Sequence, residues 1–310
     1  MGPVRISGWH AAFGPWDHQG CAALPPRHPT STFDPGAPTR RIALLSRLAL
    51  SLLPTLAFAQ GGATLKLSWD HCAGSGYVGD RSFACNTNTG ADTLYGSVVF
   101  EDGLLREQAQ IFEAHVTVTT LGSSLPSWWQ TNTGSCRSAA VTGFVPSVDS
   151  GAGCEPAFGF APLVSVLGVK LYADGGASTV EYTFIAGVPD GSGWETFYPG
   201  LEYRLFGLRL SHAKSTGTGS CAGCSVPACL GFGGLKLLYT SGHVPANESF
   251  TGNAGSTVTW QGAYVSSFTP IAPHCDANGC TYLWSGNLAC ASGPVPARNH
   301  TWGAIKSMYH

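Results

Sequence analysis

The stretch Thr64-Leu-Lys-Leu-Ser-Trp-Asp70 alternates large apolar and polar side chains. A period of two is that of a β-strand, and it places both leucines and Trp69 on one face. The same alternation returns in Ala114-His-Val-Thr-Val-Thr119 and in Val180-Glu-Tyr-Thr-Phe-Ile185. These stretches predict strands that bury one face in a core and turn the other toward solvent.

Outward from these stretches, short β-type runs alternate with turns rich in Gly, Pro and Ser, and no long stretch has the 3.6-residue period of a helix. The further runs lie at residues 95–100, 203–210, 235–239, 257–260 and 281–284. About eight short strands predict an all-β chain, a single β-sandwich of jelly-roll or immunoglobulin-like type with disulfide-stapled loops. We assign this domain to residues 60–295.

The composition of the 310 residues excludes several classes of protein. Hydrophobic residues make up 44% and charged residues 11%, whereas a disordered chain combines low hydrophobicity with high net charge. The formal net charge of -2 lacks the basic surplus of a nucleic-acid-binding protein. The sequence therefore predicts a folded protein that does not bind nucleic acid.

Residues 40–59 have the anatomy of a secretory signal peptide. Three arginines, the last of them Arg47, precede the apolar segment Leu48–Leu56, and Ala57-Phe-Ala59 fits the small-residue cleavage site. The apolar segment is shorter than the ~20 residues that span a bilayer. We therefore expect cleavage after the last alanine, and a secreted or cell-surface protein.

A signal peptide should begin its chain, and 39 residues precede this one. We interpret residues 1–39 as an N-terminal extension from a start codon assigned too far upstream, with a propeptide as the alternative. Without residues 1–59 the chain keeps 11 of its 16 basic and 16 of its 18 acidic residues, a net charge of -5. No later segment has the length of a transmembrane span, so we expect no membrane anchor after signal cleavage.

An even number of cysteines behind an export signal predicts disulfides, because the compartment is oxidising. The ten cysteines that follow the signal are Cys72, Cys85, Cys136, Cys154, Cys221, Cys224, Cys229, Cys275, Cys280 and Cys290. Their grouping along the chain favours local pairs, and we expect Cys72 with Cys85, Cys136 with Cys154, and two more pairs within the last six.

A metal site is the competing interpretation of one cysteine group. Cys221-Ala-Gly-Cys224 and Cys229 have the spacing of a zinc knuckle, which His212 or His274 could complete as a fourth ligand. Exported chains seldom keep thiolates reduced, so disulfides are favoured here. We accordingly predict neither a metal ion nor a cofactor.

Several motifs occur together along the chain. They are Cys85-Asn-Thr-Asn-Thr-Gly90, Leu125-Pro-Ser-Trp-Trp-Gln130, Gly134-Ser-Cys-Arg137, the Cys221/Cys224/Cys229 group, and the ending Thr301-Trp-Gly-Ala-Ile-Lys-Ser-Met-Tyr309. In combination the chain resembles an uncharacterised group of exported bacterial proteins that end in a Trp-Gly-x-Ile/Val-Lys-x-x-Tyr run. Those chains usually close with Arg where this one has His310. The resemblance implies export and a shared C-terminal element, and it implies no activity.

Adjacent tryptophans form the clearest candidate for ligand binding. On an extended segment Trp128 and Trp129 would face opposite ways, which would leave one ring partly exposed. An exposed indole can stack on the apolar C–H face of a sugar. The favoured interpretation is nevertheless that both rings cap the core beneath the Cys136 loop. We expect Trp194, Trp260 and Trp284 to lie in the core.

No catalytic constellation is visible. Glu101, Asp102 and Glu107 cluster near a turn, but a glycosidase needs two carboxylates at a fixed separation. We interpret these acids as solvated turn residues and His115 as a surface histidine on the polar face of its strand. Motifs such as G-x-S-x-G and H-E-x-x-H are missing from the sequence. We predict no catalytic residues.

The segment Asn86-Thr-Asn-Thr-Gly-Ala-Asp92 places oxygen atoms at alternate positions near a glycine, as calcium loops do. It lacks the closing glutamate of an EF-hand. An Asn/Gly turn held by side-chain hydrogen bonds is the favoured interpretation.

The C-terminal tail, residues 296–310, differs in character from the domain. Trp302, Ile305, Lys306 and Tyr309 follow a spacing of i, i+3, i+4 and i+7, which a short helix would gather on one side. Such an aromatic and cationic patch is a candidate sorting element. A final turn that packs on the sandwich is the alternative.

Three functions from different classes remain. The leading one is a secreted or cell-surface, non-catalytic structural or interaction protein whose partner is an extracellular glycan or a cell-surface component. The second is a carbohydrate-binding module that uses the aromatic platform. The third is a secreted hydrolase whose carboxylates the sequence does not identify.

Overall fold

The computed structural model describes residues 62–146, 153–159, 164–172, 179–189, 193–253, 255–269, 274–276, 279–281 and 287–292. Strands dominate this part of the chain, and its one helical element is the 3-10 turn η2 (Ala73–Ser75). Within the same residues no helix is long and apolar enough to cross a membrane. The expectation of an all-β chain is therefore confirmed for the residues described.

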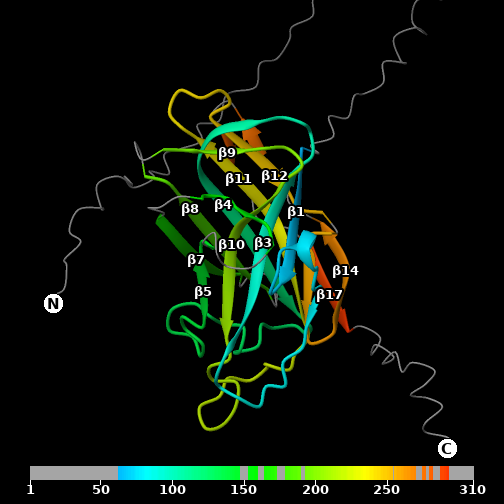
Figure 1. Ribbon diagram of the computed structural model, residues 1–310. Coiled ribbons are helices and arrows are strands. Elements are labelled where there is room, and N and C mark those ends of the chain that lie inside the picture. The colour runs from blue at the N-terminus through cyan, green and yellow to red at the C-terminus, as the bar shows by residue number, and fades with distance from the viewer. Residues whose placement is uncertain are drawn as a thin grey trace, which may run out of the picture. The chain divides into compact units, whose positions relative to one another are not determined.

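Most strands belong to two large sheets (Figure 1). The five-stranded sheet has the order β1–β3–β10–β5, with β6 also on β10. Its members are β1 (Ala63–Trp69), β3 (Ala91–Phe100), β10 (Glu202–Ser211), β5 (Val141–Phe144) and β6 (Glu155–Pro156). The pairings are antiparallel except that of β6 with β10.

The eight-stranded sheet has the order β2–β13–β11–β4–β8–β7, with β12 also on β11 and β9 on β4. Its members are β2 (Asp80–Arg81), β13 (Thr257–Trp260), β11 (Ala228–Tyr239), β4 (Arg106–Thr120), β8 (Thr179–Gly187), β7 (Val164–Tyr172), β12 (Asn247–Thr251) and β9 (Glu195–Phe197). Here the pairing of β2 with β13 is the parallel one.

Two small antiparallel sheets complete the described part. β14 (Ala263–Thr269) pairs with β17 (Asn287–Ser292), and β15 (His274–Asp276) pairs with β16 (Gly279–Thr281). β17 contacts β4 and β11 of the eight-stranded sheet, which places the β14–β17 sheet beside that sheet. The β15–β16 register sets Cys275 opposite Cys280.

The two large sheets share one buried core. The ring of Phe206 on β10 lies 5.7 Å from that of Phe184 on β8 and 5.3 Å from that of Phe232 on β11. Gly96 on β3 makes room for the Phe206 ring, because a Cβ atom at that position would overlap it. Such interdigitation fixes the two sheets against one another.

The alternating stretches of the sequence form strands as predicted. β1 buries both its leucines and Trp69, and the runs at 95–100, 114–119, 180–185, 203–210, 235–239 and 257–260 all lie within strands. Of the run at 281–284, only Thr281 is among the described residues, at the end of β16.

Among the described residues four disulfides link distant segments, so the predicted pairing of Cys72 with Cys85 and of Cys136 with Cys154 is wrong. The bonds are Cys72–Cys154, Cys85–Cys224, Cys136–Cys221 and Cys229–Cys290, with sequence separations of 82, 139, 85 and 61 residues. The sheets bring ends of distant strands together, and the cysteines follow that topology. The last of the four is a pair within the final six cysteines, as expected.

These disulfides also exclude the zinc knuckle. Cys221, Cys224 and Cys229 are each joined to a different partner, so the group holds no free thiolates. His212 uses its ring nitrogens on the Asp92 carboxylate (2.7 Å) and the Thr89 carbonyl (3.0 Å).

Candidate functional site

Both candidate platform tryptophans are buried. Trp128 is 0% exposed and Trp129 1% exposed, so both rings lie in the core as the favoured interpretation has it, and the exposed platform on these residues is wrong. The physical reason is local: residues 127–129 form a turn, and the two-face rule of an extended strand does not apply. The Trp128 indole N–H donates to Ser215 Oγ at 3.0 Å. A buried ring has no free face for a sugar.

These two rings belong to a tryptophan cluster, which we define as Trp69, Trp128, Trp129 and Trp260. The ring of Trp260 lies 5.3 Å from that of Trp128, 5.9 Å from that of Trp129 and 5.8 Å from that of Trp69. The prediction of a buried Trp260 is confirmed. Trp194 is 53% exposed, so its placement in the core is wrong, and Trp284 lies outside the described residues.

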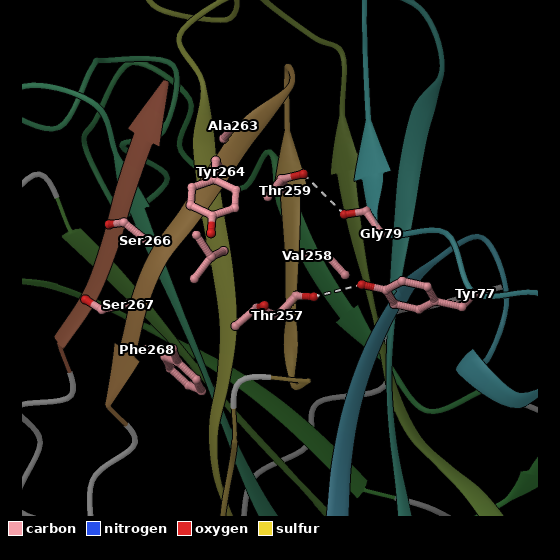
Figure 2. Close-up of a pocket in the computed structure, with 11 residues that line it drawn as sticks. Tyr77, Gly79, Thr257, Val258, Thr259, Ala263, Tyr264, Ser266, Ser267 and Phe268 are labelled. Atoms are coloured by element: carbon pink, nitrogen blue, oxygen red, sulfur yellow. Dashed lines mark hydrogen bonds between the residues drawn. The ribbon is translucent and has the colours of Figure 1, made fainter. Parts of the chain in front are cut away.

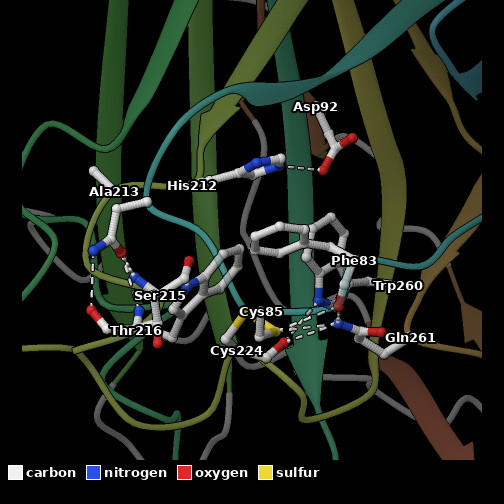
Figure 3. Close-up of a disulfide and its surroundings, with 12 residues drawn as sticks. Phe83, Cys85, Asp92, His212, Ala213, Ser215, Thr216, Cys224, Trp260 and Gln261 are labelled. Carbon is white, nitrogen blue, oxygen red and sulfur yellow. Dashed lines mark hydrogen bonds and ion pairs between the residues drawn. A yellow bond between two sulfur atoms is a disulfide. The ribbon is translucent and has the colours of Figure 1, made fainter.

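Disulfide Cys85–Cys224 lies beside Trp260 of the tryptophan cluster (Figure 3). The Trp260 indole N–H donates to the carbonyl of Cys224 at 3.0 Å. Gln261 Nε2 donates to the carbonyl of Phe83 at 2.5 Å, and the Phe83 ring stacks on His212. The disulfide thus forms part of a packed wall.

Arg137 is a buried charge that sequence reasoning did not single out. Its guanidinium lies 3.6 Å from the centre of the Trp128 ring and donates to the carbonyls of Trp128 (2.8 Å), Ala213 (3.2 Å) and Ser211. Burial lowers the pKa of this group to about 10. Its contacts fix the loop ends around the tryptophan cluster, which is a structural role.

His115 is buried at 2% exposure, so its assignment to the surface is wrong. Nδ1 lies 2.8 Å from the Glu181 carboxylate and Nε2 lies 2.8 Å from that of Glu113. Hydrogen bonding from His115 lowers the pKa of Glu113. The alternation of β4 correctly separates two faces, but the face of His115 is covered, and β17 contacts this strand.

The acidic cluster near the first turn is partly structural. Asp102 pairs with Arg106 at 2.6 Å, and Arg106 also pairs with Glu248 at 2.8 Å. The Arg106 hydrogen bond lowers the pKa of Asp102. Glu101 and Glu107 are exposed, as expected of solvated acids, whereas Asp102 is anchored by its ion pair.

The oxygen-rich loop before β3 also serves the fold. Asn88 Oδ1 accepts the backbone N–H groups of Ser215 (2.8 Å) and Thr216 (3.0 Å). The Asp92 carboxylate contacts Arg81 and His212. These oxygens therefore fasten one loop to another, in keeping with the Asn/Gly-turn interpretation.

A groove runs beside β13 and β14 on the eight-stranded side (Figure 2). It has a volume of about 440 Å³, within the ~300–1,000 Å³ of small-molecule sites. Its lining consists of Tyr77, Gly79, Thr257, Val258, Thr259, Ala263, Tyr264, Val265, Ser266, Ser267 and Phe268. We call it the tyrosine groove.

Two aromatic rings flank β13 in this groove, as Figure 2 shows. Tyr77 is 55% exposed and Tyr264 57% exposed, in contrast to the buried tryptophans. Threonine and serine side chains supply the polar part of the lining, and among the residues that the structure describes none that lines the groove carries a charge. The arrangement can stack on an apolar ring face and exchange hydrogen bonds with hydroxyl groups.

Both walls of the groove are held in place. The Tyr77 hydroxyl donates to the carbonyl of Thr257 at 3.1 Å, and the Thr259 N–H donates to the carbonyl of Gly79 at 2.7 Å. Burial raises the pKa of Tyr77, so this hydroxyl stays protonated at neutral pH. The other wall, β14, pairs with β17, which disulfide Cys229–Cys290 bonds to β11.

No protein-family model matches the chain, and no curated protein is detectably similar to it. The resemblance to an exported bacterial group therefore stays a prediction. The four residues of the candidate sorting element, Trp302, Ile305, Lys306 and Tyr309, lie outside the described residues. Sequence reasoning missed the tyrosine groove, although the run Ala263–Thr269 carries the β-type residues that could have indicated its β14 wall.

Proposed function

We propose that the protein works outside the cytoplasm as a non-catalytic interaction protein that presents the tyrosine groove to a ligand. The observation that carries this proposal is the groove itself. Two half-exposed aromatic rings from distant segments share one concavity whose walls are held by hydrogen bonds and a disulfide. A preformed site of this kind binds with little loss of conformational entropy.

The compartment follows from the disulfides. Four bonds, each closing more than 60 residues, persist in an oxidising environment such as the periplasm or the extracellular space. Together with the signal peptide at 40–59, they support a secreted or cell-surface protein. In this proposal residues 60–295 are the working domain and residues 296–310 a sorting element.

We further propose that the fold is a β-sandwich of the jelly-roll or immunoglobulin-like type. The shared core of the two large sheets supports this assignment. Sandwiches of this kind commonly serve as rigid supports for binding surfaces.

The ionisable clusters favour binding over catalysis. Asp102, Arg106 and Glu248 are joined by ion pairs, and His115 is hydrogen-bonded to Glu113 and Glu181. Each cluster fastens neighbouring segments of the eight-stranded side. None of these residues lines the tyrosine groove. The groove therefore offers contact chemistry, and the charged groups offer structural support.

The test uses protein recovered from the medium and envelope of the producing cells. We expect an exported chain beginning at Gln60 whose mass rises on reduction by at least eight hydrogens, two for each of the four disulfides. Labelled oxidised protein should be retained on washed cells or on their extracellular matrix. A cytoplasmic protein with free thiols, or an exported protein retained by neither fraction, would overturn the proposal.

A further inference from the structure

We infer that the tyrosine groove binds a neutral polysaccharide chain. This inference rests on the proposed function and names the ligand class of the same site. It places the sugar contact on Tyr77 and Tyr264, whereas the sequence alone pointed to the adjacent tryptophans.

The two rings supply the stacking surface. Each tyrosine leaves more than half of its surface exposed while its backbone belongs to a held segment. A pyranose ring presents C–H groups on its faces and hydroxyls around its rim, so an exposed aromatic face covers the apolar part. Figure 2 shows the rings on opposite sides of β13, so that one chain could contact both.

The rest of the lining matches the rim of a sugar. Thr257, Thr259, Ser266 and Ser267 bring hydroxyl groups to the groove, and the exposed Tyr264 adds a phenol. Hydroxyls both donate and accept, as sugar hydroxyls do. Thr259 Oγ1 donates to Asp80 Oδ1 at 2.7 Å and Ser266 Oγ donates to the carbonyl of Ala289 at 3.1 Å, so these oxygens are oriented to accept hydrogen bonds from the hydroxyl groups of a sugar.

The absence of charge among the lining residues narrows the class further. Phosphorylated or acidic polymers are recognised through Arg and Lys, which form charge-assisted hydrogen bonds with their anionic groups. Basic ligands call for carboxylates in the same way. A neutral glycan needs neither, and the lining residues within the described part of the chain provide neither.

The rigidity of the groove walls favours a stiff polymer as the ligand over a flexible peptide. In β14–β17 the register sets Val265, next to Tyr264, opposite Cys290, whose disulfide to Cys229 ends on the neighbouring β11. The Tyr77 wall is held on β13 by its own hydroxyl. The Tyr77 ring and the backbone that carries Tyr264 are thus held before the ligand arrives, which suits stacking along a stiff chain.

The experiment measures depletion of the purified, oxidised protein by insoluble cellulose, xylan, mannan and chitin. Polygalacturonate serves as the acidic comparison and a polyproline peptide as the aromatic-groove comparison. Tyr264→Ala and Tyr77→Ala remove one stacking face each. Tyr264→Phe keeps the ring, and Tyr198→Ala is the matched control because Tyr198 is an equally exposed tyrosine outside the groove lining.

We expect retention on at least one neutral polysaccharide. Tyr77→Ala and Tyr264→Ala should each lower the affinity about tenfold, which is the effect of losing the contact area of the exposed half of one ring. Tyr264→Phe and Tyr198→Ala should retain wild-type affinity within about twofold. The inference is overturned if the protein is retained on none of the four polysaccharides, or if it prefers polygalacturonate or polyproline. It is also overturned if Tyr77→Ala and Tyr264→Ala both bind as well as the wild type, or if Tyr198→Ala loses as much affinity as they do.

Failure of this inference can be told from failure of the proposed function. An exported, oxidised protein that is retained on cells but binds no neutral glycan contradicts the inference and leaves the interaction role intact. Cleavage of a polysaccharide that depends on the groove tyrosines for binding contradicts the non-catalytic role and leaves the ligand class intact.

Discussion

The tryptophan cluster and the tyrosine groove use the same class of residue in opposite ways. The rings of Trp128 and Trp129 are wholly buried, whereas Tyr77 and Tyr264 leave more than half of their surface in solvent. Both regions meet at β13, where Trp260 packs inward and Thr257 lines the groove. Aromatic content alone therefore does not mark a binding site, and the local backbone decides which rings remain available.

The largest expected effect is a difference in protein stability between substitutions in the tryptophan cluster and substitutions in the tyrosine groove. We expect Trp128→Ala to lower the free energy of unfolding by about 3–5 kcal/mol, because it leaves a cavity under Arg137 and between packed rings. Tyr264→Ala should change it by less than about 0.5 kcal/mol, because its ring is mostly exposed. Urea unfolding at pH 7 measures both, and equal losses would break the contrast.

The disulfides offer a test of intermediate size. Replacing both cysteines of the Cys136–Cys221 bond, or both of the Cys229–Cys290 bond, by serine should lower the free energy of unfolding by about 2–4 kcal/mol, because each bond closes a long loop of the unfolded chain. Removal of Cys136–Cys221, beside the tryptophan cluster, should leave glycan retention unchanged. Removal of Cys229–Cys290 should weaken it, because β17 and its partner β14 are then released from β11. Thermal unfolding measures the loss of stability, and the depletion assay measures glycan retention. If removal of either disulfide weakened retention equally, the assignment of the Cys229–Cys290 bond to the groove would be wrong.

Acidification should give the smallest effect. It should lower the contribution of Glu113 to stability and leave glycan retention by the tyrosine groove unchanged. The pKa of Glu113 is lowered below its ordinary value of 4.5 by the His115 hydrogen bond, with Glu181 and Lys236 nearby. The ionised Glu113 carboxylate therefore stabilises the folded protein above pH 4.5, and this stabilisation is lost as the pH falls through the lowered pKa. Glu113→Gln should therefore cost at most about 1 kcal/mol at neutral pH and less at pH 3.

Glu107→Gln is the control for this titration, because Glu107 lies exposed on the same strand. Its unfolding free energy should run parallel to that of the wild type. Glycan retention should stay constant between pH 7 and pH 5, since no groove residue carries a charge. A penalty for Glu113→Gln that does not change with pH would contradict the stabilising role of the hydrogen bond between Glu113 and His115.

The sequence predicts the strands well because alternation is a local property. Leu65, Leu67 and Trp69 are buried on one face of β1 as their spacing requires. It fails where the outcome depends on distant partners. His115 alternates correctly, yet its polar face is covered, and only the arrangement of the sheets determines that.

The groove was beyond sequence reasoning for the same reason. Tyr77 lies in the segment between β1 and β2, and Tyr264 lies on β14, far along the chain. Pairing of β2 with β13 and the Cys229–Cys290 bond bring them to one concavity. The Trp128 pair misled in the opposite direction, because a turn replaced the extended backbone that the prediction assumed.

The segment Cys221-Ala-Gly-Cys224 has a consequence for biogenesis. Its two cysteines are near neighbours, yet they bond to Cys136 and Cys85. In an unfolded chain the nearest thiols meet most often, so early oxidation should join the wrong partners. Thiol–disulfide exchange must then correct them. We expect the yield of active protein to depend on a disulfide isomerase in the compartment that receives the chain.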